Sequence, residues 1–348
     1  MTVIKRFLAF AHAWLLHAHQ AYLRSGAQGE TPQLPLIIVG AFRFGGSGKT
    51  PVAGVLAQRA HDRGIRVALI TYQLNDRHFR KFLRHLRRKA PAVSTPFRTL
   101  RRVTPASDWR EFSDESVMLA QMHTDVPGFV THNRWLAWKE LAATGLFDLV
   151  ISDDGIMDSR LHNKPGVQRI VLMNPGEKIH RSQLWPVGKL RYHQGLLSPK
   201  DVIWVGPESM LTKKSEFGFS SQGAQLTFSR EILLPPTFDK SKSWALICAI
   251  GNPVQLLSDL KRMGIKVTAK LLKRDHHAFE ESELKAFSQS NPNLGLLCTA
   301  KDAVKLPANW RNRFTILSEN ISISQKALKS LISNETPSAV NHIWTESK

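Results

Sequence analysis

Cysteine is scarce in this chain, and so is acidic charge. Cys248 and Cys298 are the only cysteines among 348 residues. Two cysteines are too few for a disulfide scaffold, and neither has the spacing of a metal ligand, which favours a reducing, cytosolic setting. Aspartate and glutamate number 28 against 48 lysines and arginines, so the formal net charge is +20. This surplus points to an anionic partner: nucleic acid, a lipid headgroup surface or a phosphorylated substrate.

The chain also lacks an uninterrupted apolar run of about 18 residues, the length that an ordinary membrane-spanning helix requires. Its N-terminal segment, residues 1–30, begins with a basic pair and continues as the apolar stretch Phe7 to Leu16. A signal peptide has this pattern too, but the small-residue cleavage site is unconvincing. An amphipathic helix in the membrane interface, with Trp14 and Tyr22 as anchors, fits better. A helix packed on the protein body is the alternative, with equal weight.

The composition is otherwise that of a folded protein. Hydrophobic residues make up 42% of the chain and charged residues 22%, which is globular rather than disordered. The length predicts either one large domain or two ordinary ones. No internal repeat or low-complexity segment stands out.

A strand–helix–strand unit is predicted directly after the N-terminal segment. An apolar strand over 36–39 leads into a glycine-rich turn, and a helical pattern runs from Pro51 to about Asp62, where Gly64 can end it. Residues 66–71 are the next predicted strand. Such a unit is the seed of a parallel, doubly wound sheet.

The glycine-rich turn carries the sharpest motif of the sequence. It reads Gly45, Gly46, Ser47, Gly48, Lys49, Thr50. Backbone amides of such a loop, at a helix N-terminus, bind nucleotide phosphates. Lys49 would reach the β- and γ-phosphates, and the hydroxyl of Thr50 would bind Mg²⁺. The strict pattern has glycine where Arg43 stands, so a plain glycine-rich turn is the alternative.

Two neighbouring carboxylates follow a later strand. The apolar segment 146–152 ends in Asp153, Asp154 and Gly155. In P-loop proteins an acidic residue at such a strand end holds Mg²⁺, directly or through water. The alternative is a pair of aspartates that only start a turn before glycine.

Two further polar segments suit proton transfer. Asp114, followed by Glu115, opens a helical pattern, where an aspartate is usually a cap. As a base, Asp114 could accept a hydroxyl proton during phosphoryl transfer. The segment Asp275 to His277 could supply a catalytic carboxylate–imidazole pair. A zinc site there would need a further ligand at a useful spacing, and a plain surface loop is the other alternative.

Basic residues are concentrated between residues 77 and 102, where ten lysines or arginines occur and no acid. Such a run is most often a solvated face or a loop. It directly follows the second predicted strand, on the side where α/β sheets bind ligands. An electrostatic funnel for an anionic substrate is therefore the second interpretation.

Downstream segments continue the alternation of strands and helices. Strands are predicted at 169–173 and 202–205, and a second strand–helix–strand stretch spans 244–271. Between residues 213 and 243 the pattern turns polar, and we place a domain change there. The expected fold class is α/β: a P-loop NTPase-like, doubly wound, mostly parallel sheet with a second, smaller α/β domain. The expected parts are an N-terminal amphipathic helix at the membrane interface (1–30), a nucleotide-binding domain (31–212) and a domain that closes over the active site (213–348).

Taken together, these blocks resemble the tetraacyldisaccharide 4'-kinase family, the lipid A 4'-kinases of Gram-negative bacteria. GGSGKTP at 45–51 is similar to the family's GGTGKTP loop, and Asp-Glu-Ser at 114–116 to its Asp-Glu-Pro helix start. The Asp-Asp-Gly at 153–155 matches the family's strand end. Further blocks in family order are LWPVGKLR (184–191), Gly-Asn-Pro (251–253), Asp-His (275–276) and TAKDAVKL (299–306).

The resemblance implies the reaction: ATP- and Mg²⁺-dependent transfer of a phosphoryl group to the 4'-hydroxyl of a tetraacylated glucosamine disaccharide 1-phosphate. It implies that the nucleotide is bound by Gly45 to Thr50 with Asp153 and Asp154. Thr50 and the two aspartates would also hold the metal, and Lys49 would take part in catalysis.

The same resemblance implies roles for four more residues. Asp114 would be the catalytic base, with His276 as its partner from the other domain. Glu115 and Arg191 would contact the substrate. The family's N-terminal helix is a membrane anchor, which implies a peripheral or N-terminally anchored protein at the cytoplasmic face of the bacterial inner membrane.

The chain departs from the family pattern at several positions. Residues 71–75 and 156–158 differ from the family's segments, Tyr192 stands where an acid is expected, and Ala41 replaces an asparagine. The level of activity, the acyl chains and the oligomeric state stay open. The alternative function is a nucleotide-dependent binding or regulatory protein, for nucleic acid or an anionic membrane, with weak or no kinase activity. Nucleic acid is the less favoured partner because no recognisable motif for it occurs.

Overall fold

The computed structural model of the chain describes residues 2–25, 29–43, 46–73, 99–173, 184, 188, 190–191, 197–198, 200–206, 226–331 and 338–345. Its strands are β1 (Leu36–Ala41), β2 (Val67–Tyr72), β3 (Leu100–Val103), β4 (Gly128–Thr131), β5 (Leu149–Asp153), β6 (Val167–Met173), β7 (Val202–Val205), β8 (Leu226–Leu233), β9 (Ser243–Cys248), β10 (Lys266–Leu272), β11 (Gly295–Thr299) and β12 (Phe314–Ile323). Its helices are α1 (Thr2–Ser25), α2 (Lys49–Asp62), α4 (Trp109–Phe112), α5 (Asp114–Met122), α6 (Arg134–Thr144), α7 (Pro253–Arg262), α8 (Glu281–Gln289), α9 (Ala300–Ala303), α10 (Ala308–Arg311), α11 (Gln325–Lys329) and α12 (Ser338–Asn341).

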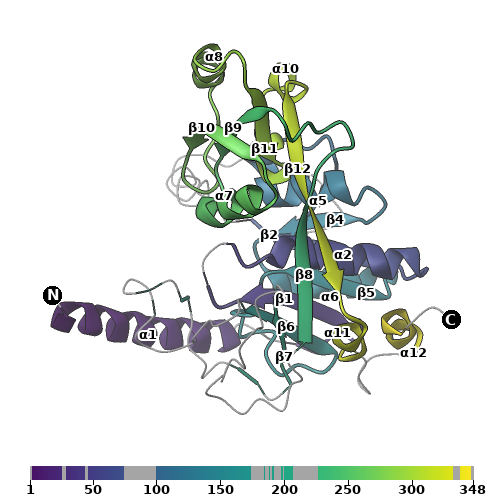
Figure 1. Ribbon diagram of the computed structural model, residues 1–348. Coiled ribbons are helices and arrows are strands. Elements are labelled where there is room, and N and C mark those ends of the chain that lie inside the picture. The colour runs from purple at the N-terminus through teal and green to yellow at the C-terminus, as the bar shows by residue number, and fades with distance from the viewer. Residues whose placement is uncertain are drawn as a thin grey trace, which may run out of the picture.

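These strands form one sheet in the order β10-β9-β11-β12-β8-β7-β6-β1-β5-β2-β4-β3. Figure 1 shows the sheet passing through two lobes, a larger one around β1, β5 and β6 and a smaller one around β9, β10 and β11. The α/β class predicted from the sequence is confirmed.

The larger lobe has the predicted parallel, doubly wound sheet. β1 pairs in parallel with β5 on one side and β6 on the other, and β5 in turn pairs in parallel with β2. All six residues of β1 are buried, which is typical of a parallel strand covered by helices on both faces. Because consecutive strands are parallel, their carboxyl ends meet at one edge, where the phosphate-binding motif follows β1.

The smaller lobe repeats this arrangement with fewer strands. β9 pairs in parallel with β10 and β11, and α7 lies between β9 and β10 in the chain, as predicted. Asn252 caps α7 by accepting a hydrogen bond from the backbone of Gln255, and Pro253 occupies the first turn, where its missing N–H costs nothing.

Two long strands connect the lobes. β8 pairs with β12 in antiparallel register from Phe228 and Ile323 to Leu233 and Ser318, and also pairs in parallel with β7. β8 falls within the polar stretch 213–243 that we interpreted as a domain change. The boundary at residue 212 stays a prediction.

The C-terminal segment returns to the larger lobe. After β12, residues including Leu328, Ile343 and Trp344 are buried in the same hydrophobic cluster as Val52 and Leu56 of α2. The chain therefore enters the smaller lobe through β8 and leaves it through β12 (Figure 1).

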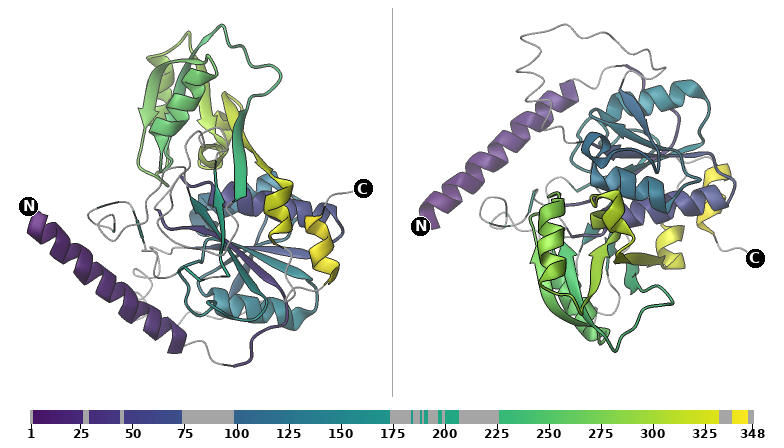
Figure 2. Two further views of the ribbon diagram at one scale, coloured as in Figure 1. Left: turned by 60° about the horizontal axis from the view of Figure 1, so that its bottom comes forward. Right: turned by 90° about the horizontal axis from the view of Figure 1, so that it is seen from above.

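The N-terminal helix α1 has an attached end and a projecting end. Near its C-terminal end, Gln20 is buried and its amide donates a 2.7 Å hydrogen bond to the carbonyl of Met157. Toward the other end, Phe10 and Trp14 are exposed, and Figure 2 shows the helix projecting from the body. No helix within the described ranges combines the length and the apolar character that crossing a membrane requires.

Most of the basic segment lies outside the described residues, as do Tyr192 and residues 74–75. Two of its arginines stand on β3, where Arg101 and Arg102 lie over the rings of Phe112 and Phe129. The interpretation of this segment as an electrostatic funnel stays a prediction.

Candidate functional site

The phosphate-binding loop lies between β1 and α2. The helix begins at Lys49, and Gly48 directly before it has a φ of 76°, a conformation that glycine adopts without strain. Gly46 also has a positive φ, and a Cβ atom on it would lie 3.0 Å from the Cβ of Asn252, at the start of α7. The loop of the larger lobe therefore abuts a helix start of the smaller lobe. Gly45 lies outside the described residues.

Thr50 and Asp153 meet at the end of this loop. The hydroxyl of Thr50 donates a 2.8 Å hydrogen bond to Oδ2 of Asp153. The other oxygen, Oδ1, is buried and has no hydrogen-bond partner among the described residues. Burial raises the pKa of Asp153 to about 7, and the negative charge of Glu115 acts in the same direction. The carboxylate thus has an unused oxygen, and the positive charge of Lys49 does not outweigh its burial.

The neighbouring Asp154 is in a different electrostatic state. Its Oδ2 accepts a 2.7 Å hydrogen bond from Arg191, for which the family resemblance implied a contact with the substrate. Burial alone would raise its pKa, but the positive charges of Lys49, Arg191 and Arg134 outweigh burial and lower the pKa to about 2. One aspartate of the pair is therefore ionised well below neutral pH, whereas the pKa of the other lies near neutral pH.

The oxygen atoms at this point suit a hard divalent cation. Thr50 and Asp153 supply two of them, and the hydroxyl of Ser47, also buried, has no hydrogen-bond partner among the described residues. Mg²⁺ prefers such oxygen ligands and completes its shell with water and substrate phosphate. Within the described ranges, no group of three or more histidine, cysteine, aspartate or glutamate side chains could hold a metal ion, so the zinc interpretation of 275–277 gains no support.

Arg134 is a site residue that the sequence analysis missed. Its guanidinium donates hydrogen bonds to the Ser152 hydroxyl and to the carbonyl of Asp153, and it lies over the ring of Tyr72. A Cβ atom on Gly155 would lie 2.8 Å from its side chain. Arg134 thereby holds the end of β5, where the two aspartates stand.

Asp114 and His276 come together from the two lobes. Nδ1 of His276 lies 2.8 Å from Oδ1 and 3.1 Å from Oδ2 of Asp114. Ser113 caps α5 by accepting a hydrogen bond from the backbone of Ser116, so Asp114 is not the cap. His276 has a φ of 63°, which is costly for a non-glycine residue and which the loop after β10 holds.

Charge determines the protonation of this pair. Burial alone would raise the pKa of Asp114, but the hydrogen bond from His276 and the charges of Lys301 and Lys305 lower it on balance. The same hydrogen bond raises the pKa of His276. An ionised Asp114 beside a readily protonated His276 is therefore the favoured state.

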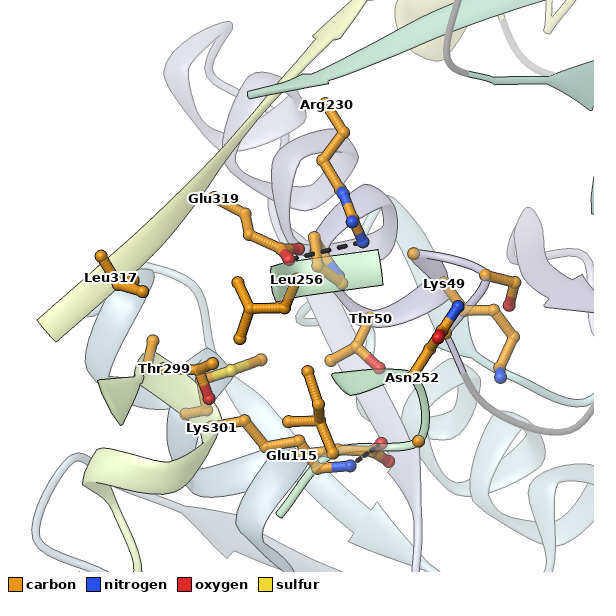
Figure 3. Close-up of a pocket in the computed structure, with 18 of the residues that line it drawn as sticks. Lys49, Thr50, Glu115, Arg230, Asn252, Leu256, Thr299, Lys301, Leu317 and Glu319 are labelled. Carbon is orange, nitrogen blue, oxygen red and sulfur yellow. Dashed lines mark hydrogen bonds and ion pairs between the residues drawn. The ribbon is translucent and has the colours of Figure 1, made fainter. Parts of the chain in front are cut away.

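Glu115 and Asp275 share one lysine. Nζ of Lys301 lies 3.0 Å from Oε1 of Glu115 and 2.9 Å from Oδ1 of Asp275. Burial would lower the pKa of Lys301, but Glu115, Asp114 and Asp275 together raise it. Figure 3 shows the contact between Lys301 and Glu115 across the pocket floor. The structure thus places Glu115 in an ion pair between the lobes.

A pocket lies between the phosphate-binding loop and the ion pair of Glu115 with Lys301. Its polar part is formed by residues 46–50 and by the start of α7, and its apolar part lies between α5, β8, α7 and β12. Arg230 and Glu319 form an ion pair of 3.4 Å at its edge (Figure 3). The apolar side chains that line it include Met118, Met122, Ile232, Ile250, Leu256 and Leu317. A phosphate-binding end beside an apolar end suits a nucleotide.

Comparison with known proteins identifies one kinase family. A family model described as tetraacyldisaccharide-1-P 4'-kinase matches residues 3–336. The chain is 28% identical over 294 residues to the tetraacyldisaccharide 4'-kinase of Alcanivorax borkumensis, covering 83% of this chain and 80% of that one. It is 29% identical over 296 residues to the enzyme of the same name from Pasteurella multocida, covering 84% and 82%.

A solved structure has the same fold. LpxK from Aquifex aeolicus, in complex with ATP, superposes with a TM-score of 0.63 and covers 97% of both chains at 19% sequence identity. At that identity the likeness establishes the architecture of both lobes together.

Proposed function

Because the chain belongs to the tetraacyldisaccharide-1-P 4'-kinase family, we propose that phosphoryl transfer takes place where its two lobes meet. The protein is an ATP-dependent phosphotransferase with an alcohol acceptor. It phosphorylates the 4'-hydroxyl of a tetraacylated glucosamine disaccharide 1-phosphate, a step of lipid A biosynthesis. We do not favour the alternative function of a purely binding or regulatory protein.

The phosphates of ATP would lie on residues 46–50. Lys49 would neutralise the β- and γ-phosphates, and the backbone amides at the start of α2 would donate to them. The start of α7 faces the same space from the smaller lobe, as the close approach of Gly46 and Asn252 indicates. The apolar part of the pocket would then accommodate the base. Gly45 would belong to the same loop.

Mg²⁺ would be held by Thr50 and Asp153, with Asp154 beside them. This assignment is supported by the unpartnered Oδ1 of Asp153 and by its raised pKa, because a bound cation would satisfy both. When bound, the ion neutralises negative charge on the phosphate oxygens and orients them. Arg191 would act here through its hydrogen bond to Asp154.

Asp114 would be the base. It would take the proton of the acceptor hydroxyl while the oxygen bonds to the γ-phosphorus, and the bond from that phosphorus to the bridging oxygen breaks, releasing ADP. His276 would orient the carboxylate. The observation that carries this assignment is the 2.8 Å contact of Asp114 with His276, since the two side chains come from different lobes. Glu115, paired with Lys301, would border the acceptor.

Because the acceptor is acylated, we expect the protein to act at a membrane surface. The exposed Phe10 and Trp14 of α1, together with the net charge of +20, support attachment to an anionic lipid surface. We infer a peripheral position on the cytoplasmic face of the bacterial inner membrane, where ATP is present.

The decisive experiment is transfer of labelled γ-phosphate from Mg–ATP to tetraacyldisaccharide 1-phosphate in detergent micelles. Wild type would be compared with Lys49→Ala and Asp114→Asn, and with Lys261→Ala as a control on an exposed part of α7. Turnover by wild type and the control, lost in the other two, is expected. Absence of wild-type turnover despite ATP binding would instead favour the regulatory function.

A further inference from the structure

Lys305 is a cation that the proposed mechanism has not used. Its side chain is completely buried, and its Nζ lies 2.8 Å from Oδ1 of Asp302, which is also completely buried. It donates a further hydrogen bond, of 3.2 Å, to the carbonyl of Ala249 at the end of β9. Burying an ammonium costs free energy even when it is paired, so a function for Lys305 beyond its pairing with Asp302 is worth seeking.

The same ammonium faces the proposed base. Nζ of Lys305 lies 3.7 Å from Oδ2 of Asp114, and no carboxylate other than these two is within ion-pair distance of it in the described part of the chain. Asp114 stands on α5 of the larger lobe, whereas Lys305 follows α9 of the smaller lobe. The contact therefore forms only where the lobes meet.

Three cationic side chains face Asp114, and they differ in how free their charge is. His276 comes from the loop after β10, and Lys301 comes from α9, with Nζ 3.9 Å away. Lys301 is shared with two other carboxylates, those of Glu115 and Asp275. Among carboxylates in the described part of the chain, Lys305 has only Asp302 as a second partner. It therefore adds positive charge beside Asp114, after Lys301 and His276, from a completely buried position.

We propose that Lys305 is a positioning residue for phosphoryl transfer, whose buried charge keeps Asp114 a carboxylate and fixes it against His276. This inference rests on the proposed role of Asp114 as the base. Lys305 does not line the nucleotide pocket, and its contact with the reacting groups is the one with Asp114. The smaller lobe would thereby supply the positive charge that keeps the base, on the larger lobe, ionised and able to accept a proton.

A matched control lies over the same aromatic ring. Nζ of Lys273 lies 5.6 Å from the centre of the Phe279 ring, and that of Lys305 lies 5.7 Å from it. Lys273 pairs with Glu283 and has no ion pair to Asp114. Replacing either lysine by methionine removes one buried or half-buried ammonium from the smaller lobe, but only one replacement removes it from Asp114.

The test is the pH dependence of kcat at saturating Mg–ATP for wild type, Lys305→Met, Lys305→Arg and Lys273→Met. In Lys305→Met we expect kcat to fall about tenfold, because Asp114 is no longer fixed against His276. We also expect its acid limb to move up by roughly one pH unit, because a nearby cation favours the carboxylate. The KM for ATP should stay unchanged. Lys305→Arg should restore the wild-type limb, and Lys273→Met should retain it.

Two results would overturn the inference, and they differ. Asp114→Asn with undiminished turnover would overturn the base assignment and this inference together. An inactive Asp114→Asn beside a Lys305→Met whose rate falls evenly at every pH would leave the base in place and overturn the inference alone. If Lys305→Met does not fold, the double variant Lys305→Met with Asp302→Asn also removes the carboxylate left without its partner. The acid limb of kcat is expected to move up in this double variant. An unmoved acid limb would count against the proposal.

Discussion

Gly46 and Asn252 lie so close that a Cβ atom on the glycine would approach the Cβ of the asparagine to 3.0 Å, tighter than an ordinary van der Waals contact. One belongs to the phosphate loop and the other caps α7, so the two lobes are in contact at the nucleotide site itself.

Replacing Gly46 by alanine should therefore impair nucleotide binding. Gly64→Ala is the matched control, because Gly64 also has a positive φ but has open space around it. Both variants should lose about 1 kcal/mol of unfolding free energy from the backbone conformation. Only Gly46→Ala should also weaken ATP binding, by about tenfold or more, as measured by calorimetry. Equal ATP affinities in the two variants would show that the lobes can shift apart at this contact without affecting the nucleotide site.

The state of Asp153 predicts how Mg²⁺ binding depends on pH. Its pKa is raised to about 7 in the metal-free protein, so a cation must displace a proton below that pH. We expect Mg–ATP to raise the melting temperature over Mg-free ATP more at pH 8 than at pH 6. Thr50→Ser keeps the hydroxyl and should behave as wild type, whereas Asp153→Asn should lose the difference between the two pH values. A wild-type difference that is independent of pH would contradict the assignment.

The pair of Asp114 and His276 predicts a pH window of stability. The pKa of His276 is raised above its ordinary value of 6.5, so its contribution is complete below pH 6.5 and is lost as pH rises through the higher folded value. The pKa of Asp114 is lowered below 3.8, so its contribution is lost only under more acidic conditions. The melting temperature of wild type should exceed that of His276→Gln between about pH 4 and 6.5, and the difference should shrink toward pH 9. His277→Gln, one residue away, is the control, and a difference that grows with pH would refute the pairing.

The projecting part of α1 predicts a separation of membrane binding from chemistry. Phe10 and Trp14 are exposed, whereas Gln20 attaches the helix to the body. Replacing Phe10 and Trp14 together by glutamate should reduce binding to vesicles of phosphatidylglycerol by about tenfold or more. Turnover in detergent micelles should stay within about twofold of wild type. Tyr22→Glu, near the attached end, is expected to have the smaller effect, and unchanged vesicle binding in the double variant would place the membrane contact elsewhere.

Local motifs allowed much of this molecule to be predicted from the sequence. The strand before Gly46, the helix after Thr50 and the acidic strand end at Asp153 are local patterns with one dominant physical cause each. The approach of Asp114 to His276 was expected only through the family resemblance, since 162 residues separate them in the chain.

Long-range ion pairs escaped prediction for a physical reason. Lys301 and Lys305 look like ordinary surface lysines in a helical segment, because their partners on α5 stand far away in the sequence. The contacts of Arg134 also escaped prediction, because this residue of α6 donates its hydrogen bonds to the strand that follows, β5. Glu115 was expected to contact substrate, and its ion pair with Lys301 became visible only once the two lobes were placed together.

The path of the chain through the lobes bears on how the protein is made. Val52 and Leu56, near the beginning, share a hydrophobic cluster with Ile343 and Trp344, near the end. A ribosome releases the N-terminal strands long before it releases those last two side chains. The lobe whose synthesis starts first is thus the one whose core is completed last, while the smaller lobe can assemble as soon as β12 has emerged.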